Sequence, residues 1–420
     1  MAQAYATADV MTTTDGVPLK VSLRRAMRRN RIKAVLLVAP LLLFILFTFM
    51  IPIVQMLWRS VDNPELRAAI PETLALLEQW DGEDTPPEEV YAVFAAEMKA
   101  GREAKTIGKV GARLNREVSG MRSLVNKTAR RIGKVEQGPF KEAFIKVDKR
   151  WGETDTWRHI KRIGASYTSA FYVGAFDMRY DADGSIALQP ENKRIYIDLF
   201  LRTLWISLLV TVFCIALGYP IDYLMAILPT RTSNLLMILV LLPFWTSLLV
   251  RTSSWIVILG KNGVLNDILV WIGIVSDDNR LEMMFNQTGV IVAMTHILLP
   301  FMVLPLFSVM KTIPPSYMRA ARSLGATPLT AFLRVYLPQT VPGVGAGSIL
   351  VFIVAIGYYI TPALVGGQSG QMISNLIAYH MQQSLNWGLA AALGTLLLMG
   401  VLALYWLYNK VVGIDNMKLG

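Results

Sequence analysis

Six apolar stretches, each about as long as a membrane-spanning helix, separate the charged sections of this chain. They cover residues 34–57, 199–224, 235–259, 290–310, 344–362 and 389–408. A helix needs about 20 predominantly apolar residues to cross a hydrocarbon layer about 30 Å thick. The pattern therefore predicts an all-α integral membrane protein with six transmembrane helices. Prolines inside several stretches, among them Pro52, Pro220, Pro243 and Pro305, indicate kinks whose freed backbone groups are satisfied by neighbouring helices.

The longest polar section, residues 60–197, predicts a soluble, mainly helical insertion outside the membrane. Pro86 and Pro87 precede two acidic residues and then apolar residues at helical spacing, which is typical of a helix start. A second helical pattern covers residues 110–135. Residues 166–188 combine aromatic and β-branched residues with a DADGS turn, and therefore predict short extended pieces.

Composition and charge support the membrane assignment and predict an orientation. Of the 420 residues 54% are hydrophobic, and the mean hydropathy is +0.43. Lysines and arginines crowd the edges of the apolar stretches, as they do on the cytoplasmic side of membrane proteins. When the basic flank before residue 34 is placed inside, the cluster at 311–334 and the C-terminal lysines also fall inside. This predicts cytoplasmic segments at both ends, residues 1–33 and 411–420, and an insertion on the outer side.

The formal net charge of +11 therefore reflects topology, and no nucleic-acid partner is expected. The sequence contains no GxxxxGK[ST] phosphate-binding pattern, so no nucleotide site is expected on this chain. The three histidines are far apart and form no HExxH arrangement, and the single cysteine, Cys214, excludes a Cys-based zinc site or a disulfide. For His296, inside an apolar stretch, a hydrogen-bonded packing role is favoured over a proton relay. We expect neither catalytic residues nor a metal.

The connector between the fourth and fifth apolar stretches, residues 311–342, is the most informative part of the chain. Its central sequence, residues 317–338, is YMRAARSLGATPLTAFLRVYLP. The small residues Ala320 and Ala321 permit close approach, and Gly325 permits a left-handed turn between two short helices. The apolar face expected on these helices consists of Leu324, Leu329 and Phe332.

This connector resembles the EAA loop of ABC importer permeases, whose pattern is Glu-Ala-Ala, three residues, Gly, nine residues, Ile, any residue, Leu-Pro. The matching positions are Ala320, Ala321, Gly325, Val335, Leu337 and Pro338. Arg319 stands where the family has its glutamate, so a salt bridge through that glutamate does not carry over. The resemblance implies a loop that docks on an ATPase, and the residues it assigns to coupling are Arg319, Ala320, Ala321, Leu324, Gly325, Leu329, Phe332, Leu337 and Pro338. The alternative is a helical connector lying on the membrane surface.

The resemblance continues over residues 195–410 and narrows to the spermidine/putrescine-type branch, the PotB-like subunits. Matching stretches include LGYPIDYLMA, LLPFWTSLLVRTSSW, GVLNDIL, LPFMVLPLFSVM, VPGVGAGSILVF and ITPALVGGQSGQMISNLI. It implies the six-helix fold of type I ABC importer permeases. In that fold the first helix, residues 34–57 here, wraps a partner permease, and the core domain covers residues 199–410. Transport would proceed by alternating access.

The resemblance also implies partners in a bacterial inner membrane: an ABC ATPase dimer, a second permease subunit that is a different chain, and a periplasmic substrate-binding protein. ATP and Mg²⁺ would be held by the ATPase subunits, and this chain would carry no cofactor and catalyse no reaction. The large insertion departs from the family's short first connector. Two hypotheses for it stay open: a helical cap that contacts the binding protein or the second permease, and a solvated decoration.

A translocation path is expected near the outer halves of the third and fifth apolar stretches. Its candidate residues are Arg251, Trp255, Tyr358, Tyr359 and Thr361. A buried cation needs a partner or water, so a structural arginine between helices is an equal alternative for Arg251. An aromatic packing role is the alternative for the tyrosines.

The expected cargo is a small polar solute such as a polyamine, an opine or an amino-acid derivative. A polyamine favours carboxylates and aromatic faces, yet the apolar stretches contain few acids, and Asp222 lies near an inner end. Two other classes were weighed: a secondary carrier, and a membrane-anchored accessory or sensor protein with a large outer domain. Neither accounts for the Ala-Ala and Gly pattern in the cytoplasmic connector.

Overall fold

The computed structural model describes residues 19–412 and divides the chain into two compact units, residues 1–58 and 59–420. Within the described residues the predicted helical membrane protein is confirmed. Five helices are long and apolar enough to cross a membrane, or six if one bent pair is a single span. The expected terminal segments 1–33 and 411–420 lie partly outside the described residues.

Among the described residues, the first unit is a helical segment. It consists of α1 (Leu19–Ile45), a π-helical stretch (Leu46–Met50) and α2 (Ile51–Arg59), whose last residue already belongs to the second unit. Residues Ala26–Arg59 form a candidate span with a mean hydropathy of 2.9. A helix that is apolar all round needs lipid or another protein around it, and this one has the length to cross a bilayer.

The second unit begins with the insertion, a bundle of short helices followed by a hairpin. Its elements are α3 (Pro64–Arg67), α4 (Pro71–Gln79), α5 (Glu88–Glu103), α6 (Ile107–Glu117), α7 (Met121–Ile132), α8 (Phe140–Val147), a 3₁₀ turn (Lys149–Gly152), α9 (Thr154–Ile163), α10 (Ala170–Ala175), β1 (Met178–Tyr180), β2 (Ile186–Leu188) and a 3₁₀ turn (Glu191–Lys193). The helix predicted after Pro87 is confirmed as α5, with Glu88 and Glu89 in its first turn, where the helix dipole favours acidic residues.

An aromatic cluster forms the core of the insertion. Tyr91, Phe94, Phe144, Trp151 and Trp157 are fully buried, and their rings meet mostly edge to face at centroid distances of 4.7–5.7 Å. The Tyr91 hydroxyl donates a 2.6 Å hydrogen bond to the Trp151 carbonyl and accepts one of 3.1 Å from Trp157 Nε1. The insertion therefore has a hydrophobic core of its own, in which the Tyr91 hydroxyl and the Trp157 indole N–H are hydrogen-bonded.

The extended pieces predicted for residues 166–188 are confirmed at the hairpin and at Tyr167, which forms an antiparallel bridge with Asp62. β1 and β2 pair antiparallel, with Met178 opposite Leu188 and the DADGS sequence at the turn. The earlier aromatic part forms α10 instead, so the prediction there is wrong. Its Phe171 and Ala175 are buried, because packing against neighbouring helices outweighs the weak strand preference of a short aromatic run.

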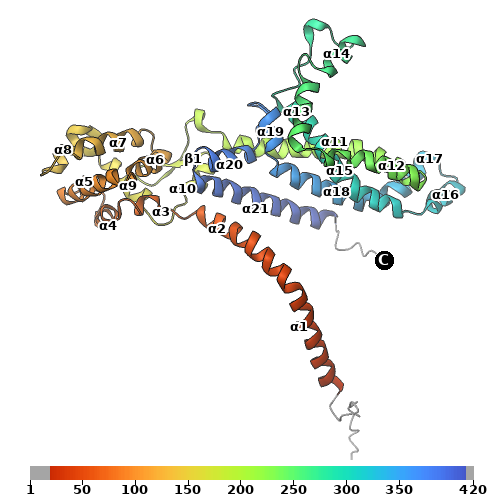
Figure 1. Ribbon diagram of the computed structural model, residues 1–420, viewed down its shortest axis with the longest axis horizontal. Coiled ribbons are helices and arrows are strands. Elements are labelled where there is room, and N and C mark those ends of the chain that lie inside the picture. Colours follow the sequence, from red (N-terminus) through yellow and green to blue (C-terminus); the bar gives the residue numbers. More distant parts are fainter. Residues whose placement is uncertain (1–18, 413–420) are drawn as a thin grey trace, which may run out of the picture. The chain divides into compact units, whose positions relative to one another are not determined.

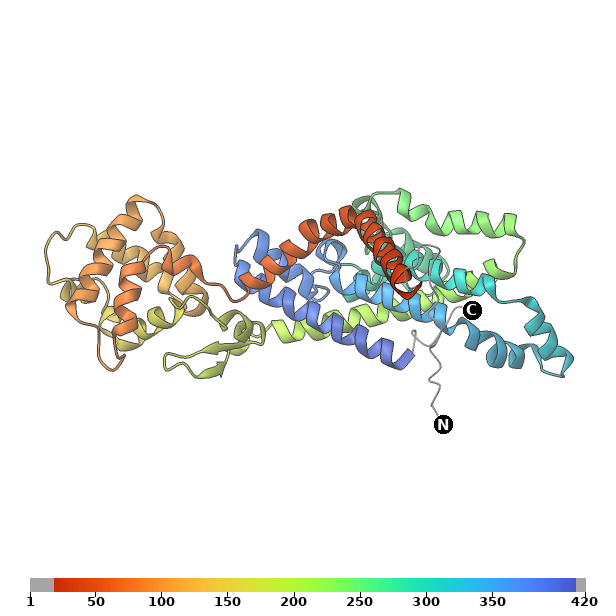
Figure 2. The same ribbon diagram turned by 90° about the horizontal axis from the view of Figure 1, so that it is seen from below.

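The membrane core follows the insertion. Its elements are α11 (Tyr196–Ile227), α12 (Thr230–Leu241), a 3₁₀ turn (Leu242–Trp245), α13 (Leu248–Leu259), α14 (Val264–Trp271), a 3₁₀ turn (Asp277–Asn279), α15 (Gln287–Thr312), α16 (Pro315–Ser323), α17 (Pro328–Ala331), a π-helical stretch (Phe332–Tyr336), α18 (Leu337–Gly357), α19 (Ile360–Val365), α20 (Ile373–Gln382) and α21 (Trp387–Val412). Helices α11, α15 and α18 pack around a shared buried cluster that includes Val210, Met294 and Val351. Figures 1 and 2 show the insertion at one end of these helices and α16 and α17 at the other.

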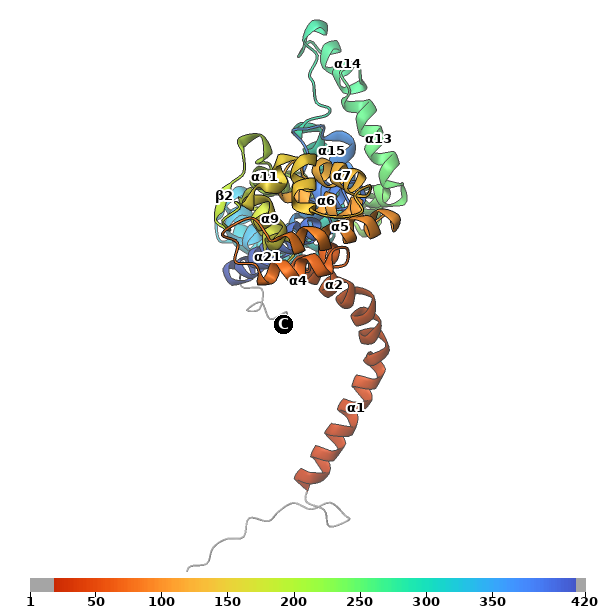
Figure 3. The same ribbon diagram turned by 90° about the vertical axis from the view of Figure 1, so that its left-hand side faces the viewer.

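The apolar stretch at 235–259 forms two helical pieces, although the sequence indicated only a kink at Pro243. The pieces Thr230–Trp245 and Leu248–Trp271 meet at an angle of 97°. Pro243 lies in the 3₁₀ turn, and the Thr246 hydroxyl donates a 2.9 Å hydrogen bond to its carbonyl, which replaces a helical bond lost at the break. Figures 1 and 3 show α13 and α14 projecting away from α11 and α15.

Candidate functional site

The connector between α15 and α18 folds as two short helical pieces, as the sequence predicted. Pro315 begins α16, and the Thr327 hydroxyl accepts a 3.2 Å hydrogen bond from the Thr330 amide at the start of α17. Residues 332–336 then continue as a π-helical stretch directly into α18, where Leu337 and Pro338 occupy the first turn. The connector is thus a short exposed helix, a turn, and a helix fused to a spanning helix.

Gly325 makes the turn that ends α16. Its φ is +91°, in the left-handed region that favours glycine. The Ala326 amide donates to the Ala321 carbonyl at 3.1 Å and the Gly325 amide donates to the Arg322 carbonyl at 3.0 Å, which is the Schellman pattern of helix ends. The predicted left-handed turn at Gly325 is confirmed, and these two bonds define the direction in which the chain leaves α16.

The exposed apolar surface of the connector differs from the predicted one at Phe332. Leu324 and Leu329 are 89% and 67% exposed, as expected for a face offered to a partner. Phe332 is turned inward, and its ring lies 5.4 Å from that of Tyr223 on α11, so its placement on the exposed face is wrong. Tyr317 and Leu333, which the sequence did not single out, are half exposed instead. The inward position is held by ring contacts with Tyr219 and Tyr223 on α11.

The remaining residues assigned to the connector lie on or beside α16. Arg319 and Ala320 are exposed and Ala321 is half-buried. Among the described residues, no carboxylate lies within ion-pair distance of Arg319. Arg319 is therefore an exposed cation available to a partner.

The expected path residues gather where α13 faces α15 and α19. Trp255 Nε1 donates a 3.2 Å hydrogen bond to His296 Nδ1, and the two rings meet at 5.4 Å. The hydroxyls of Thr252 and Thr361 are 3.3 Å apart. For His296 the sequence favoured a hydrogen-bonded packing role over a proton relay, and its bond to Trp255 arises because the fold places α15 beside α13.

Arg251 lies in this cluster, and most of its guanidinium N–H groups have no hydrogen-bond acceptor among the described residues. Its Nε and Nη1 atoms are buried and have no hydrogen-bond acceptor among the described residues. A cavity of about 560 Å³ opens beside Trp255 and His296, and the rest of its wall, from α11 and α15, is apolar except for Thr288 and Thr295. Tyr358 and Tyr359 follow the end of α18, where their carbonyls accept hydrogen bonds from Ser374 and Asn375. The predicted helix over 344–362 therefore ends earlier, at Gly357.

Asp222 occupies a different place, on α11 near the connector. Its side chain is fully buried, and both carboxylate oxygens lack a hydrogen-bond partner within the described residues. Its neighbours on α11, Tyr219 and Tyr223, pack against Phe332. The structure therefore keeps Asp222 apart from the cluster around Arg251.

Comparison with known proteins explains this combination of spans and connector. The model of the family described as "Binding-protein-dependent transport system inner membrane component" matches residues 218–412. The spermidine/putrescine transport system permease protein PotB of Escherichia coli (strain K12) is 36% identical over 228 residues, which are 53% of this chain and 82% of PotB. The chain belongs to this family of inner membrane transport permeases. It is a permease subunit of a binding-protein-dependent ABC importer.

The relatives of this permease are named for more than one substrate. PotB of Haemophilus influenzae is 36% identical over 221 residues, 51% of this chain and 77% of the relative. The molybdenum transport system permease protein ModB of Mycobacterium bovis is 31% identical over 188 residues, 44% of this chain and 69% of the relative. Among solved structures, a bacterial ABC transporter involved in the import of alginate aligns with a TM-score of 0.41 and 20% identity, over 55% of this chain and 82% of that one.

The insertion of this permease lies outside the family match, which begins at residue 218. It is nevertheless tied to the core by specific contacts. The Asp177 carboxylate accepts hydrogen bonds from the amides of Ile195, Tyr196 and Ile197 at 2.9–3.0 Å, which caps the start of α11. Because those amides have no intrahelical partner, the insertion supplies part of the first core helix's own hydrogen bonding.

A second set of contacts joins the insertion to the start of α21. Arg116 donates a 3.1 Å hydrogen bond to the Leu385 carbonyl. A Cβ on Gly388 would lie 2.2 Å from the Phe171 ring, so only glycine allows α10 to approach α21 this closely. The insertion is therefore fastened to both α11 and α21.

Proposed function

We propose that this permease passes a small polar solute, of the polyamine, opine or amino-acid class, across a bacterial inner membrane, and that α16 couples it to ATP hydrolysis on partner subunits. The exposed connector with its Schellman turn at Gly325 carries this proposal, because it offers two apolar side chains to a protein groove: Leu324, which caps the end of α16, and Leu329 on α17. Two exposed leucines on short helical pieces joined by a fixed turn suit a partner pocket that excludes water.

The proposed assembly contains an ATPase dimer, a second permease subunit, a periplasmic binding protein and the surrounding lipid. ATP and Mg²⁺ belong to the ATPase subunits in this proposal, and this chain is the non-catalytic subunit. Its core domain is residues 199–410, and its coupling loop is residues 311–342. Arg319 replaces the family glutamate, so we expect a carboxylate on the ATPase at that contact.

The proposed orientation places both termini and α16 in the cytoplasm and the insertion in the periplasm. The basic cluster at 311–334 supports this, since lysines and arginines favour the cytoplasmic side. The ends of the core helices support it as well: α16 and the insertion lie at opposite ends of α11 and α15 (Figure 1).

For the solute, we propose a path along Arg251, Trp255, Tyr358, Tyr359 and Thr361. Arg251 offers donors without acceptors, and Trp255 and His296 border a cavity of about 560 Å³. Solute-binding sites are concave and mostly apolar, with a few convergent polar groups, and this cavity has that character. The PotB relatives support the polyamine class among the three candidates.

The test is ATP hydrolysis by the purified complex in proteoliposomes, with candidate binding proteins loaded with spermidine, an opine or an amino acid. We expect one loaded protein to stimulate hydrolysis. The double variant Leu324→Glu, Leu329→Glu should lose this stimulation by at least about tenfold, which corresponds to about 1.4 kcal/mol of docking free energy.

The matched control is Ile186→Glu with Leu188→Glu, two apolar side chains of β2 that are 55% and 58% exposed. This pair should leave stimulation unchanged, because β2 belongs to the insertion and not to the coupling loop. Normal stimulation of the loop variant would refute coupling through α16. If no loaded binding protein stimulates the intact wild-type complex, the proposed solute classes are wrong.

A further inference from the structure

Two consecutive segments, which make up the first two-thirds of the insertion, carry opposite charge. Residues 60–101 contain ten acidic residues and two basic ones, whereas residues 102–150 contain fourteen lysines and arginines and five acidic residues. The acidic segment includes α4, and the basic segment includes α6 and α7. Figures 1 and 3 show α4 and α7 on opposite sides of the insertion, with α5 between them. The insertion is therefore a strongly dipolar domain.

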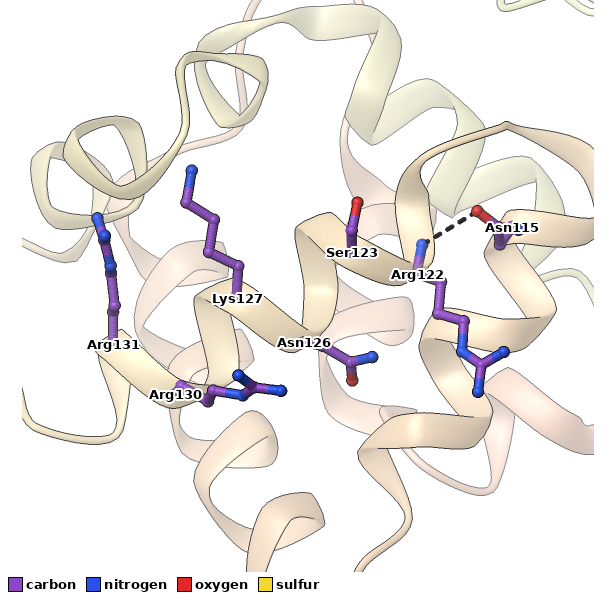
Figure 4. Close-up of a pocket in the computed structure, with 7 residues that line it drawn as sticks. All are labelled: Asn115, Arg122, Ser123, Asn126, Lys127, Arg130 and Arg131. Carbon is purple, nitrogen blue, oxygen red and sulfur yellow. Dashed lines mark hydrogen bonds between the residues drawn. The ribbon is translucent and has the colours of Figure 1, made fainter.

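The positive charge is concentrated on the outer face of α7. A hollow of about 720 Å³ is lined by Asn115, Arg122, Ser123, Asn126, Lys127, Arg130 and Arg131, which we call the α7 patch. Figure 4 shows two rows of side chains along the helix, one with Arg122, Asn126 and Arg130 and the other with Ser123, Lys127 and Arg131. Both rows follow the four-residue spacing that aligns side chains on a helix face.

The charge of the α7 patch is mostly uncompensated. Lys127 pairs with Asp148 at 3.2 Å. Among the described residues no ion pair involves Arg122, Arg130 or Arg131, and all three side chains are exposed. Like charges along one helix face repel one another, and a partner with several carboxylates would relieve that repulsion.

The helix beneath the patch is fixed. Its opposite face, formed by Met121, Leu124, Val125, Ala129 and Ile132, is buried in the insertion's core. The Asn115 side chain accepts hydrogen bonds from the amides of Gly120 and Arg122, which sets the turn between α6 and α7. The patch is thus mounted on a rigid platform, and the insertion itself is fastened to α11 and α21 through Asp177, Arg116 and Gly388.

The chemistry of the α7 patch suits a broad acidic protein surface. The arginines are exposed, so the patch lacks the buried donors that would select one small anion. A membrane surface is less suited, since α7 lies on the helical bundle beyond the ends of α11 and α21 (Figures 1 and 2). Several exposed guanidinium groups together can pair with several carboxylates of a docking protein.

We propose that the α7 patch is the docking surface for an acidic face of the periplasmic substrate-binding protein. This rests on the proposed function, because it requires a delivering protein. Charge at the rim of an interface acts mainly on the association rate, through electrostatic steering that salt screens. Contacts of the insertion with α11 and α21 then connect the docked protein to the core helices.

The test uses the complete complex in lipid nanodiscs and the binding protein that stimulates its ATP hydrolysis. The triple variant Arg122→Gln, Arg130→Gln, Arg131→Gln should slow association about tenfold or more at low salt and flatten its salt dependence. The matched control is Lys105→Gln, Lys109→Gln, Lys146→Gln, which removes the same charge from exposed positions of the insertion that do not line the patch. The control should change the rate less than about twofold.

Four outcomes separate the possibilities. Slow association of the triple variant alone, with its thermal unfolding unchanged, supports the proposal. If both variants slowed association equally, the proposed local docking surface would be wrong, and only the overall positive charge of the insertion would act on the association rate. Unchanged association by the triple variant, in a complex still stimulated normally, would overturn the docking surface while the importer function stands. If the triple variant still bound the binding protein normally but no longer bound phosphatidylglycerol vesicles, the patch would be a lipid site and the proposal would be overturned.

Discussion

Replacing Gly325 by alanine tests whether the left-handed turn after α16 sets the coupling loop's direction. A Cβ at this position would meet no atom within 4 Å, so the substitution adds no steric clash. Its cost comes only from holding a non-glycine residue at φ +91°, which is about 1–2 kcal/mol. A cost of that size lowers the ratio of loops with the native turn to loops in any other conformation by a factor of about 5–30.

Four residues at position 325 give a graded expectation. Asparagine tolerates the left-handed region best after glycine, so Gly325→Asn should stay close to wild type. Gly325→Ala should lower binding-protein-stimulated ATP hydrolysis several-fold. Gly325→Val should lower it further, because a β-branched side chain restricts the backbone most at positive φ. The assay is stimulated hydrolysis in proteoliposomes, with assembly checked by the amount of ATPase that co-purifies.

Gly394 provides the matched control. It lies in α21, a Cβ added there would meet no atom within 4 Å, and its φ is not positive. Gly394→Ala should therefore leave coupling unchanged and stabilise the helix by about 0.5–1 kcal/mol. Equal stimulated rates for glycine, alanine and valine at position 325 would refute the reasoning, because the turn would then have no role in coupling.

Two further predictions concern the outer part of the molecule. Tyr91→Phe removes a donor to the Trp151 carbonyl and an acceptor for Trp157 Nε1, so it should destabilise the insertion by about 1–2 kcal/mol in pulse proteolysis of the full chain; an unchanged midpoint would contradict this. Burial, with a smaller contribution from Arg116, lowers the pKa of His380 to about 4. The neutral ring is thus favoured, and its stability contribution is complete above the ordinary pKa of about 6.5 and is lost as pH falls toward 4. Thermal unfolding at pH 7.5 and 5 should show a larger drop for wild type than for His380→Gln, and identical drops would exclude His380 as the cause.

Local sequence pattern was sufficient for most helices and for the coupling loop's turn. The spans follow from the length of apolar stretches, α5 from its proline and acidic start, and the turn from Gly325, because each depends on residues close together in the chain. The same holds for the β1–β2 hairpin, which the DADGS turn marked. Roles of the coupling and path residues stay predictions, since geometry alone does not measure transport.

The tertiary structure decided what depends on contacts between distant parts of the chain. Phe332 turns toward Tyr223, more than a hundred residues earlier, and Trp255 finds His296 on another helix. The attachment of the insertion through Asp177 and Gly388 has no local signature, because its partners lie on α11 and α10. Periodicity fixes which face of a helix is apolar, but only packing against a specific neighbour decides which of those side chains stays exposed to a partner and which is buried.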